Sequence, residues 1–406
     1  MYKKSCRTCS SENLKPVVSF GNSPLANNLL DSIEDETELF PLEVEYCENC
    51  HNVQLNYVVP AEKLFKHYLY VSSTTKSMRD HFEKASSHYT DMFGLNEDSL
   101  VIDIGSNDGV ALKPFKEKNV KVLGIEPATN IAKIAVESGI DTINDFFSNN
   151  IIDEILQKGK ADIITASNVF AHADGIEEIV KTAFKTLKDD GSFIVEVQYI
   201  LNTINDLTFD NVYHEHVTYW SVSSLNNFFK SLGFKLYRIE HIDTHGGSIR
   251  GFVCKDDREI QSSVTEFLTN EVENGLTNYT TYLDFGKRVE NAKNNVVNNI
   301  KKLKQAGISI VGYGSPAKAT TALNYFGITN KQIDYIIEDN QLKHNKIVPG
   351  VNIPIYPKEK AELNLPDIIL VLAWNFFEEV KSNNKKLIDL GVRFVNIKEL
   401  QNENWN

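Results

Sequence analysis

Four of the five cysteines stand in two C-x2-C pairs near the N-terminus. Cys6 and Cys9 form the first pair, and Cys47 and Cys50 form the second. Two such turns can direct four thiolates at one tetrahedral Zn²⁺ ion. Because four thiolates leave no open coordination position, the pattern predicts a structural zinc site and not a catalytic one. The alternatives are coincidence, redox use of the cysteines, or a site in which His51 replaces one thiolate.

A short apolar run over residues 99–104 ends in a glycine turn. The run carries Asp103, and Gly105 and Gly109 follow in the spacing G-x-x-x-G. This spacing differs from the G-x-G-x-x-G of nicotinamide-binding folds and resembles the first motif of class I S-adenosylmethionine (SAM)-dependent methyltransferases. About twenty residues later Glu126 ends the next apolar run, where a carboxylate can accept hydrogen bonds from both hydroxyls of a ribose.

Two further segments complete the predicted cofactor site. Residues 144–147, Asn-Asp-Phe-Phe, resemble the adenine pocket of such methyltransferases, and residues 167–168 end the fourth apolar run. Open α/β sheets bind ligands at the C-terminal ends of their strands, so these segments are expected to converge on one cleft. A generic nucleotide-binding α/β domain is the alternative. The predicted SAM-binding residues are Asp103, Gly105, Ser106, Asp108, Glu126, Pro127, Asp145, Phe146, Ser167 and Asn168.

The densest cluster of ionisable groups is Tyr213-His214-Glu215-His216. Such a cluster can be a metal site, a general base with an orienting partner, or a solvated loop. The H-x-H pair has no convincing third ligand nearby and does not match the H-E-x-x-H of zincins, so acid–base chemistry is favoured. His172 follows the fourth apolar run just past the cofactor residues, which is expected to set it near the reacting methyl group.

A second glycine turn contains Gly312 and Gly314 and precedes a helix that is expected to begin near Ala317. The third glycine of a dinucleotide fingerprint is missing, and Lys318 near the helix start favours phosphate. NAD is the alternative ligand. Trp374 ends a later apolar run, where it can contact a base or pack in the core.

The composition excludes several classes of protein. The 406 residues suggest about three domains, and 42 Lys and Arg against 55 Asp and Glu give a formal charge of −13 with no basic run, which argues against nucleic acid. No stretch approaches the roughly 18 apolar residues of a membrane span, and the N-terminus lacks the apolar core of a signal peptide. We therefore expect a cytoplasmic protein, a monomer without membrane partners, in which the fifth cysteine, Cys254, is a core thiol.

The segments that carry these residues read as strands alternating with helices. This alternation predicts parallel, doubly wound sheets. Two strands without an intervening helix suit an antiparallel pair at the edge of the first sheet. Residues 256–305 are expected to form helices that lead into a second strand–helix repeat. The predicted strands are 99–105, Val122–Ile125, Ile163–Ala166, Phe193–Val197, Lys235–Ile242, Ser248–Cys254, 307–312, Ile333–Ile337 and Ile368–Trp374, and predicted helices lie around Val110–Lys118, Ile131–Glu137 and Ile176–Leu187.

The whole chain resembles the sugar C-3-methyltransferases that build branched deoxysugars. The resemblance lies in the four-cysteine segment, the SAM motif and three stretches, 213–216 (Y-H-E-H), 245–250 (H-G-G-S-I-R) and 312–318 (G-Y-G-S-P-A-K). It implies an α/β fold with a structural zinc domain at 1–71, a Rossmann-like class I SAM-dependent methyltransferase domain at 72–255, and a helical connector with a second Rossmann-like domain at 256–406. It implies methyl transfer from SAM to carbon 3 of a nucleotide-linked 4-keto-6-deoxysugar.

The resemblance also assigns roles to residues. It implies that His216 is the base, that Tyr213 and Glu215 are its neighbours, and that Tyr70 and His172 line the active site. The C-terminal half is implied to help hold the nucleotide diphosphate. The substrate-binding residues expected on this basis are His214, His245, Arg250, Ser315, Lys318, Lys343 and Trp374.

The chemistry follows from the nucleophile. A carbon that attacks a sulfonium methyl must be an enolate, so the substrate needs a carbonyl beside the methylated carbon. We expect His216 to remove the proton, while Tyr213, Tyr70 or His172 donates to the carbonyl oxygen and Glu215 holds the imidazole tautomer. Two other functions compete: SAM-dependent O- or N-methylation, which needs no enolate, and a zinc-ribbon adaptor, which needs no SAM pocket.

Overall fold

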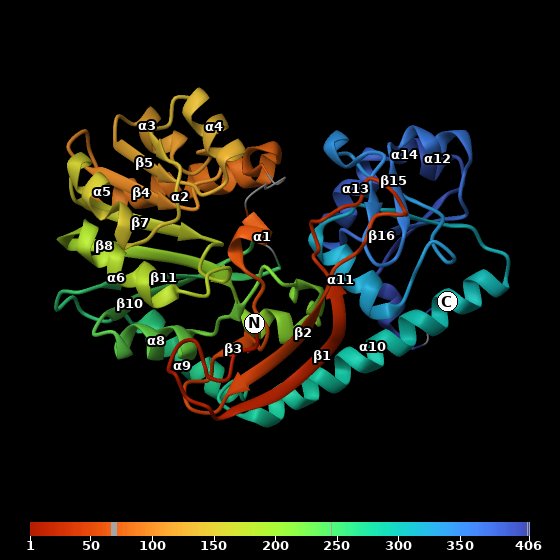
Figure 1. Ribbon diagram of the computed structural model, residues 1–406, viewed down its shortest axis with the longest axis horizontal. Coiled ribbons are helices and arrows are strands. Elements are labelled where there is room, and N and C mark those ends of the chain that lie inside the picture. The colour runs from red at the N-terminus through yellow and green to blue at the C-terminus, as the bar shows by residue number, and fades with distance from the viewer. Residues whose placement is uncertain (66–70, 245, 404, 406) are drawn as a thin grey trace.

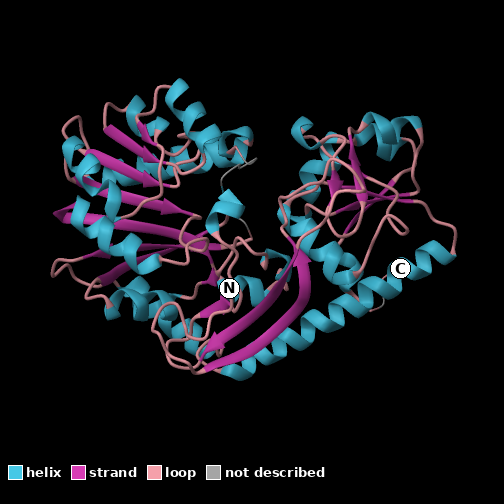
Figure 2. Cartoon of the chain, in the orientation of Figure 1, coloured by secondary structure: helices cyan, strands magenta, loops and turns pink. Residues whose placement is uncertain are grey.

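The computed structural model describes residues 1–65, 71–244, 246–403 and 405, which form three β-sheets with helices packed on them (Figures 1 and 2). Figure 1 shows two lobes, one on each of the two larger sheets, with the small sheet and a long helix, α10 (Tyr279–Gln305), below and between them. The predicted α/β architecture is therefore confirmed. None of the described helices is both long enough and apolar enough to cross a membrane.

The lobe formed by the middle of the chain, called the middle lobe below, is built on a sheet of order β10-β11-β8-β7-β4-β5-β6. Strands β4 to β8 run parallel, and β11 and β10 add an antiparallel pair at one edge, as predicted. Val101 and Ile102 in β4 are completely buried because helices cover both faces, which explains the uninterrupted apolar run. The strands are β4 (Leu100–Ile104), β5 (Lys121–Ile125), β6 (Thr142–Ile143), β7 (Ala161–Ser167), β8 (Leu187–Gln198), β10 (Lys235–Ile242) and β11 (Ser248–Cys254).

The helices of this lobe follow the predicted pattern, with α3 shorter than expected and β8 starting directly where α6 ends. The fifth cysteine, Cys254, is a buried core thiol, as expected. The helices are η1 (Ser72–Thr74), α2 (Lys76–Phe93), α3 (Lys113–Glu117), α4 (Thr129–Glu137), η2 (Asn149–Ile151), α5 (Ile152–Lys158), α6 (Ile176–Thr186), α7 (Ile200–Asn205), η3 (Phe209–Asn211), α8 (Val222–Ser231) and α9 (Ser262–Glu273).

The C-terminal lobe contains a second, mainly parallel sheet of order β14-β15-β13-β12-β16-β17, as the second strand–helix repeat predicts. Its strands are β12 (Ile310–Tyr313), β13 (Ile336–Ile337), β14 (Ile347–Val348), β15 (Ile353–Tyr356), β16 (Ile368–Val371) and β17 (Arg393–Asn396). Its helices are α11 (Ala317–Phe326), η4 (Gln341–Lys343), α12 (Glu359–Leu363), η5 (Trp374–Phe376), α13 (Phe377–Asn383), α14 (Lys385–Asp389) and η6 (Glu399–Gln401).

The small sheet joins distant parts of the chain. Strands β1 (Leu14–Pro24), β2 (Leu39–Cys47) and β3 (Val53–Leu55) come from the N-terminal segment, which ends in α1 (Ala61–Phe65). The fourth strand, β9 (Thr218–Tyr219), belongs to the middle of the chain and pairs with β3. A strand of two residues has no sequence signature, so this link was not predicted.

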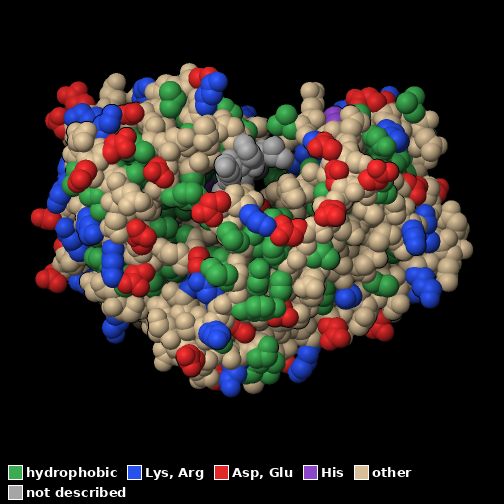
Figure 3. All heavy atoms as spheres, viewed as in Figure 1, with side chains coloured by type: hydrophobic (Ala, Val, Ile, Leu, Met, Phe, Trp, Pro, Cys, Tyr) green, Lys and Arg blue, Asp and Glu red, His purple; other side chains and the backbone are tan. Residues whose placement is uncertain are grey.

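Charged side chains of both signs are interspersed over the face in Figure 3, which is notched between the two lobes. This distribution agrees with the absence of a basic run in the sequence. The surface on view therefore offers no continuous cationic track.

Helix α10 packs closely on β1. The hydroxyl of Tyr279 donates to the carbonyl of Pro16 (2.6 Å), and the ring of Tyr282 stacks on Tyr46 with 4.4 Å between centroids. A Cβ atom at Gly286 would lie 2.3 Å from the carbonyl oxygen of Val17. Glycine is therefore required for this approach, although it lowers helix propensity.

We predict that Gly286→Ala lowers the free energy of unfolding by about 1–3 kcal/mol, because the added methyl must push β1 and α10 apart. Chemical denaturation measures the change. Asn291→Ala, on an exposed position of the same helix, is the control and is expected to be neutral or slightly stabilising. Equal stability of the glycine variant and the wild type would contradict this explanation.

Candidate functional site: a zinc cluster and a histidine loop

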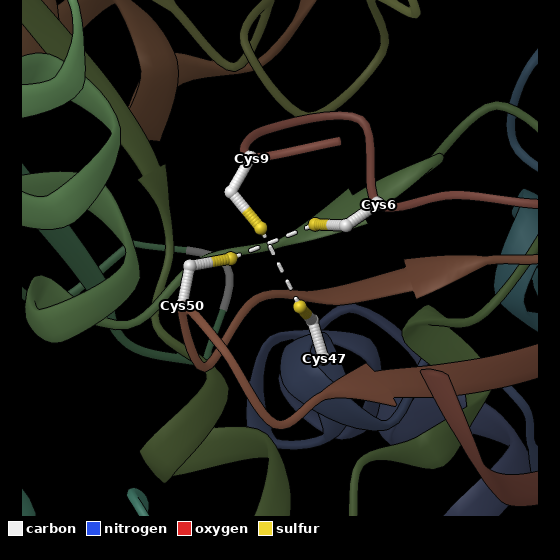
Figure 4. A group of neighbouring side chains, drawn as sticks. All are labelled: Cys6, Cys9, Cys47 and Cys50. Atoms are coloured by element: carbon white, nitrogen blue, oxygen red, sulfur yellow. Dashed lines mark hydrogen bonds between the residues drawn. The ribbon is translucent and has the colours of Figure 1, made fainter. Parts of the chain in front are cut away.

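The four paired cysteines meet in one cluster (Figure 4). All four sulfur atoms lie within 4.8 Å of one another, with 3.5 Å between Cys6 and Cys50 and 3.6 Å between Cys9 and Cys47. A tetrahedral Zn²⁺ with bonds of about 2.3 Å requires sulfur–sulfur distances of about 3.8 Å. The cluster therefore fits a closed, structural Zn²⁺ site.

Both cysteine pairs sit on the same kind of turn. The N–H of Ser10 donates to the carbonyl of Cys6 (2.8 Å), and the N–H of His51 donates to the carbonyl of Cys47 (2.9 Å). The Nδ1 atom of His51 is hydrogen bonded to the Tyr46 hydroxyl (2.6 Å), so the imidazole is engaged outside the cluster. Among the described residues, no other group of His, Cys, Asp or Glu side chains has the geometry of a metal site.

The first zinc turn is tied to the segment that contains the predicted base. Arg7, between the first two cysteines, is almost fully buried and donates to the carbonyls of Leu55 (3.2 Å) and Val217. Its Nε atom lies 3.4 Å from a carboxylate oxygen of Asp174. Since Val217 directly follows His216, the zinc turn holds the backbone next to the predicted base.

The imidazole of His216 is oriented by a hydrogen bond at each nitrogen. Nδ1 donates to the carbonyl of Asn211 (2.7 Å), and Nε2 accepts from the hydroxyl of Tyr213 (2.9 Å). A carbonyl can only accept, so Nδ1 carries a proton, and in the neutral imidazole Nε2 then holds the lone pair. The ring of His172 meets His216 edge-on, with 4.8 Å between centroids. The predicted catalytic residues Tyr213, His216 and His172 therefore form one group.

Two predicted roles in this loop need correction. Glu215 was expected to hold the tautomer of His216, but the Asn211 carbonyl does so, and Glu215 accepts from the amide of Asn27 (2.6 Å). His214 was expected to bind substrate, but its Nε2 faces the carbonyls of Phe40 (3.3 Å) and Pro41 (3.2 Å). Successive side chains of the loop point in different directions, so both residues fasten it to the N-terminal segment.

The predicted cofactor residues follow the C-terminal ends of four neighbouring strands, β4, β5, β6 and β7. Glu126 accepts from the N–H groups of Asn107 (2.9 Å) and Ala128 (2.8 Å), so it draws the glycine turn toward β5. Gly105 has φ +63°, and a Cβ there would lie 2.5 Å from a methyl carbon of Val169. The sequence-predicted convergence on one sheet edge is thus present in the structure.

The other members of this set have distinct environments. Burial raises the pKa of Asp103 to about 7, although the hydroxyl of Thr165 donates to its carboxylate (2.6 Å) and lowers the pKa. Ser106 and Asp108 are buried, whereas Asp145 and Phe146 lie exposed on the turn after β6. The remaining three complete the edge: Pro127 after β5, and Ser167 and Asn168 at the end of β7.

Arg250 was predicted to bind substrate, and the structure gives it another role. It is buried in β11, where Nη2 lies 2.7 Å from a carboxylate oxygen of Glu196 and Nη1 lies 3.3 Å from Glu240. These residues face Arg250 on the two neighbouring strands, β8 and β10. The guanidinium therefore ties three strands together.

The C-terminal candidates form two groups. In the first, the N–H and hydroxyl of Ser315 donate to Glu338 (2.8 and 2.6 Å), and Lys343 donates to the Ser315 carbonyl (2.8 Å). In the second, the ammonium of Lys318 lies buried 4.7 Å from the centre of the Trp374 ring, without a hydrogen-bond acceptor among the described residues. The remaining candidates, Tyr70 and His245, lie outside the described residues.

Comparison with known proteins gives matches along nearly the whole chain. Residues 6–65 match the model of a zinc-binding domain, residues 77–239 that of a methyltransferase domain, and residues 243–397 that of a C-methyltransferase C-terminal domain. The C-methyltransferase NovU of Streptomyces niveus is 35% identical over 396 residues, which cover 96% of this chain and 94% of that protein.

Two more distant similarities are confined to part of the chain. A ubiquinone biosynthesis O-methyltransferase of Rhodopseudomonas palustris is 26% identical over 115 residues, covering 28% of this chain and 44% of that protein. A solved magnesium protoporphyrin IX methyltransferase of Synechocystis covers 44% of this chain and 83% of its own, with 12% identity and a TM-score of 0.35.

We predict that Cys47→Ser loses the bound zinc and lowers the melting temperature by several degrees, because three thiolates no longer close the site. Metal analysis of the purified protein and thermal unfolding measure both effects. Cys254→Ser makes the same chemical change outside the cluster and is expected to keep one zinc per chain. Full zinc content in Cys47→Ser would exclude this cysteine as a ligand.

Proposed function

Because this chain belongs to the family of SAM-dependent C-methyltransferases that contains NovU, we propose that it methylates carbon 3 of a nucleotide-linked 4-keto-6-deoxysugar. The observation that carries the proposal is the pair formed by His216 and Tyr213. In its neutral form the His216 imidazole has its lone pair on Nε2, which lies 2.9 Å from the Tyr213 hydroxyl, so a base and a hydrogen-bond donor are presented side by side.

This pair matches a hydrogen next to a carbonyl. In a 4-keto sugar, the proton on carbon 3 and the oxygen on carbon 4 are neighbours, and removal of the proton places negative charge on that oxygen. His216 takes the proton from carbon 3 while a double bond forms between carbons 3 and 4. The Tyr213 hydroxyl turns from Nε2 to the developing oxyanion and stabilises it. O- or N-methylation needs no such arrangement.

SAM, when bound, supplies an electrophilic sulfonium methyl group. Transfer of this group to carbon 3 would form the new C–C bond at the expense of the C–S bond, with S-adenosylhomocysteine as the leaving group. His172 touches the His216 ring and follows β7, whose end belongs to the cofactor edge, so it lines the path between base and methyl. Tyr70 is proposed to line the same site.

The cofactor edge is proposed to hold SAM in the following way. Glu126 accepts the ribose hydroxyls, because each carboxylate oxygen keeps a free lone pair beside its backbone bond. Gly105 and Ser106 let the backbone approach the methionine part, and Asp103 and Asp108 flank it. The segments Asp145–Phe146 and Ser167–Asn168 border the adenine.

The nucleotide part of the sugar is proposed to lie against the C-terminal lobe. Lys318 is a buried cation without a hydrogen-bond acceptor among the described residues, which suits a phosphate oxygen. Ser315, Lys343, Trp374 and His245 are the other proposed contacts. All these groups belong to one chain, and we propose that a monomer in the reducing cytoplasm, which keeps zinc thiolates intact, is the active form.

One test of this proposal concerns the cofactor. Glu126→Gln is expected to weaken SAM binding by about 10- to 100-fold, because an amide cannot accept from both ribose hydroxyls as a carboxylate does. Isothermal calorimetry measures the affinity. Glu338→Gln makes the same change at the corresponding place of the other sheet and is expected to leave SAM affinity unchanged. Equal affinity in Glu126→Gln and the wild type would exclude the ribose contact.

Another test of this proposal concerns the reaction itself. Incubated in D2O with a nucleotide-linked 4-keto-6-deoxysugar, the wild type is expected to introduce deuterium at carbon 3 without SAM and a methyl group at carbon 3 with SAM. His216→Asn is expected to lose both activities and keep SAM affinity, because only the base is removed. Mass spectrometry and NMR locate the labels. Methyl transfer to oxygen or nitrogen without exchange at carbon 3 would favour the alternative reaction.

A further inference from the structure

We propose that Asp210 is a positioning residue for the catalytic base, held in place by Trp374 of the C-terminal lobe. This inference rests on the proposed function, since it assigns to His216 the role of base. Neither residue needs to touch the carbon that reacts. Their effect passes through the backbone of the short helix η3.

At Asp210 the two lobes are joined by a buried hydrogen bond, next to the packing of Phe209 on Tyr325 and Phe326 of α11. The indole Nε1 of Trp374 donates to a carboxylate oxygen of Asp210 (2.5 Å), and the Asp210 side chain is buried. A hydrogen bond to a buried carboxylate is among the stronger ones in proteins, because the charge has few other ways to be stabilised. The bond therefore fixes Asp210 relative to the C-terminal lobe.

The residue after Asp210 makes the bond that orients the base. Asn211 accepts the Nδ1 proton of His216 with its carbonyl oxygen (2.7 Å). Its own side chain is held by Thr208 (3.2 Å) and Gln198 (3.5 Å), both from the middle lobe. Asn211 is thus fixed from the middle lobe and Asp210 from the C-terminal lobe, and the peptide between them determines where the carbonyl points.

The surroundings of Trp374 make its position well defined. The ammonium groups of Lys318 and Lys398 lie 4.7 and 4.9 Å from the ring centre. Burial raises the pKa of the Asp210 carboxyl, and the nearby charge of Lys318 acts in the opposite direction. The indole is therefore held by two cations and one anion, and the same group of residues is proposed to meet the nucleotide. Through Trp374 the nucleotide side of the site and the base share one support.

The test is a double-mutant cycle with Asp210→Ala and Trp374→Phe. Phenylalanine keeps an aromatic face for both lysines and removes only the N–H donor. Each single variant is expected to lower kcat and the rate of deuterium exchange at carbon 3 by about 10- to 100-fold, because a misplaced base loses its alignment. SAM affinity is expected to stay unchanged, and the KM for the sugar is expected to change less than kcat, because phenylalanine keeps the aromatic face that is proposed to meet the nucleotide. The double variant is expected to be no slower than either single one.

Two further variants keep the result unambiguous. Trp405→Phe makes the same change elsewhere in the C-terminal lobe and is expected to behave as the wild type. Asp210→Asn keeps an acceptor for the indole and is expected to retain most of the exchange rate, so it serves as the folded variant should Asp210→Ala not fold.

Three outcomes would overturn the inference: additive losses in the double variant, a rise in the KM for the sugar alone, or unchanged exchange in Trp374→Phe. The KM result would mean that Trp374 only contacts the nucleotide. Failure of the proposed function looks different, because the wild type itself would then show neither exchange nor methylation at carbon 3.

Discussion

The hydrogen bond from Nδ1 of His216 to the Asn211 carbonyl determines which nitrogen of the imidazole is available for the proposed role as a base. A proton on Nδ1 leaves the lone pair on Nε2, next to the hydroxyl of Tyr213. This local bond depends on three separate parts of the chain. The zinc turn holds Val217 through Arg7, the hairpin β1–β2 holds His214 and Glu215, and the C-terminal lobe holds Asp210. The closed metal site thus supports the loop of the proposed base without offering the substrate a coordination position.

The two α/β sheets close their glycine turns in the same way. Glu126, at the end of the second parallel strand of the middle lobe, accepts the N–H of Asn107, and Glu338, at the end of β13, accepts the N–H of Ser315. An acid at this place stabilises the turn by satisfying backbone N–H groups that would otherwise be unpaired. The side chains around each acid, however, differ between the two lobes. Beside Glu338 lie Lys343 and the Ser315 hydroxyl, which also donates to it, whereas Glu126 receives backbone donors only among its described contacts.

Patterns within short stretches of sequence were sufficient for much of the fold. Apolar runs marked β4, β5, β7 and the pair β10–β11, and cysteine spacing marked the zinc cluster, because each signal is contained in a few neighbouring residues. The supports of the loop were not predictable in this way. Asn27 and Glu215 are 188 positions apart, and no local pattern encodes such a pair. Arg250 was misassigned for the same reason, since its carboxylate partners are defined only by strand register.

The loop around His216 is hydrogen bonded to residues near both ends of the chain, and this has a consequence for protein synthesis. Arg7 and Val217 are separated by 210 positions, and Asp210 and Trp374 by 164. The middle sheet can form once its own strands have left the ribosome, because its contacts are mostly local to it. The proposed base, in contrast, gains its last support only when nearly the entire polypeptide has emerged. An interrupted translation product would therefore hold the cofactor edge without the aligned base that the proposed methylation requires.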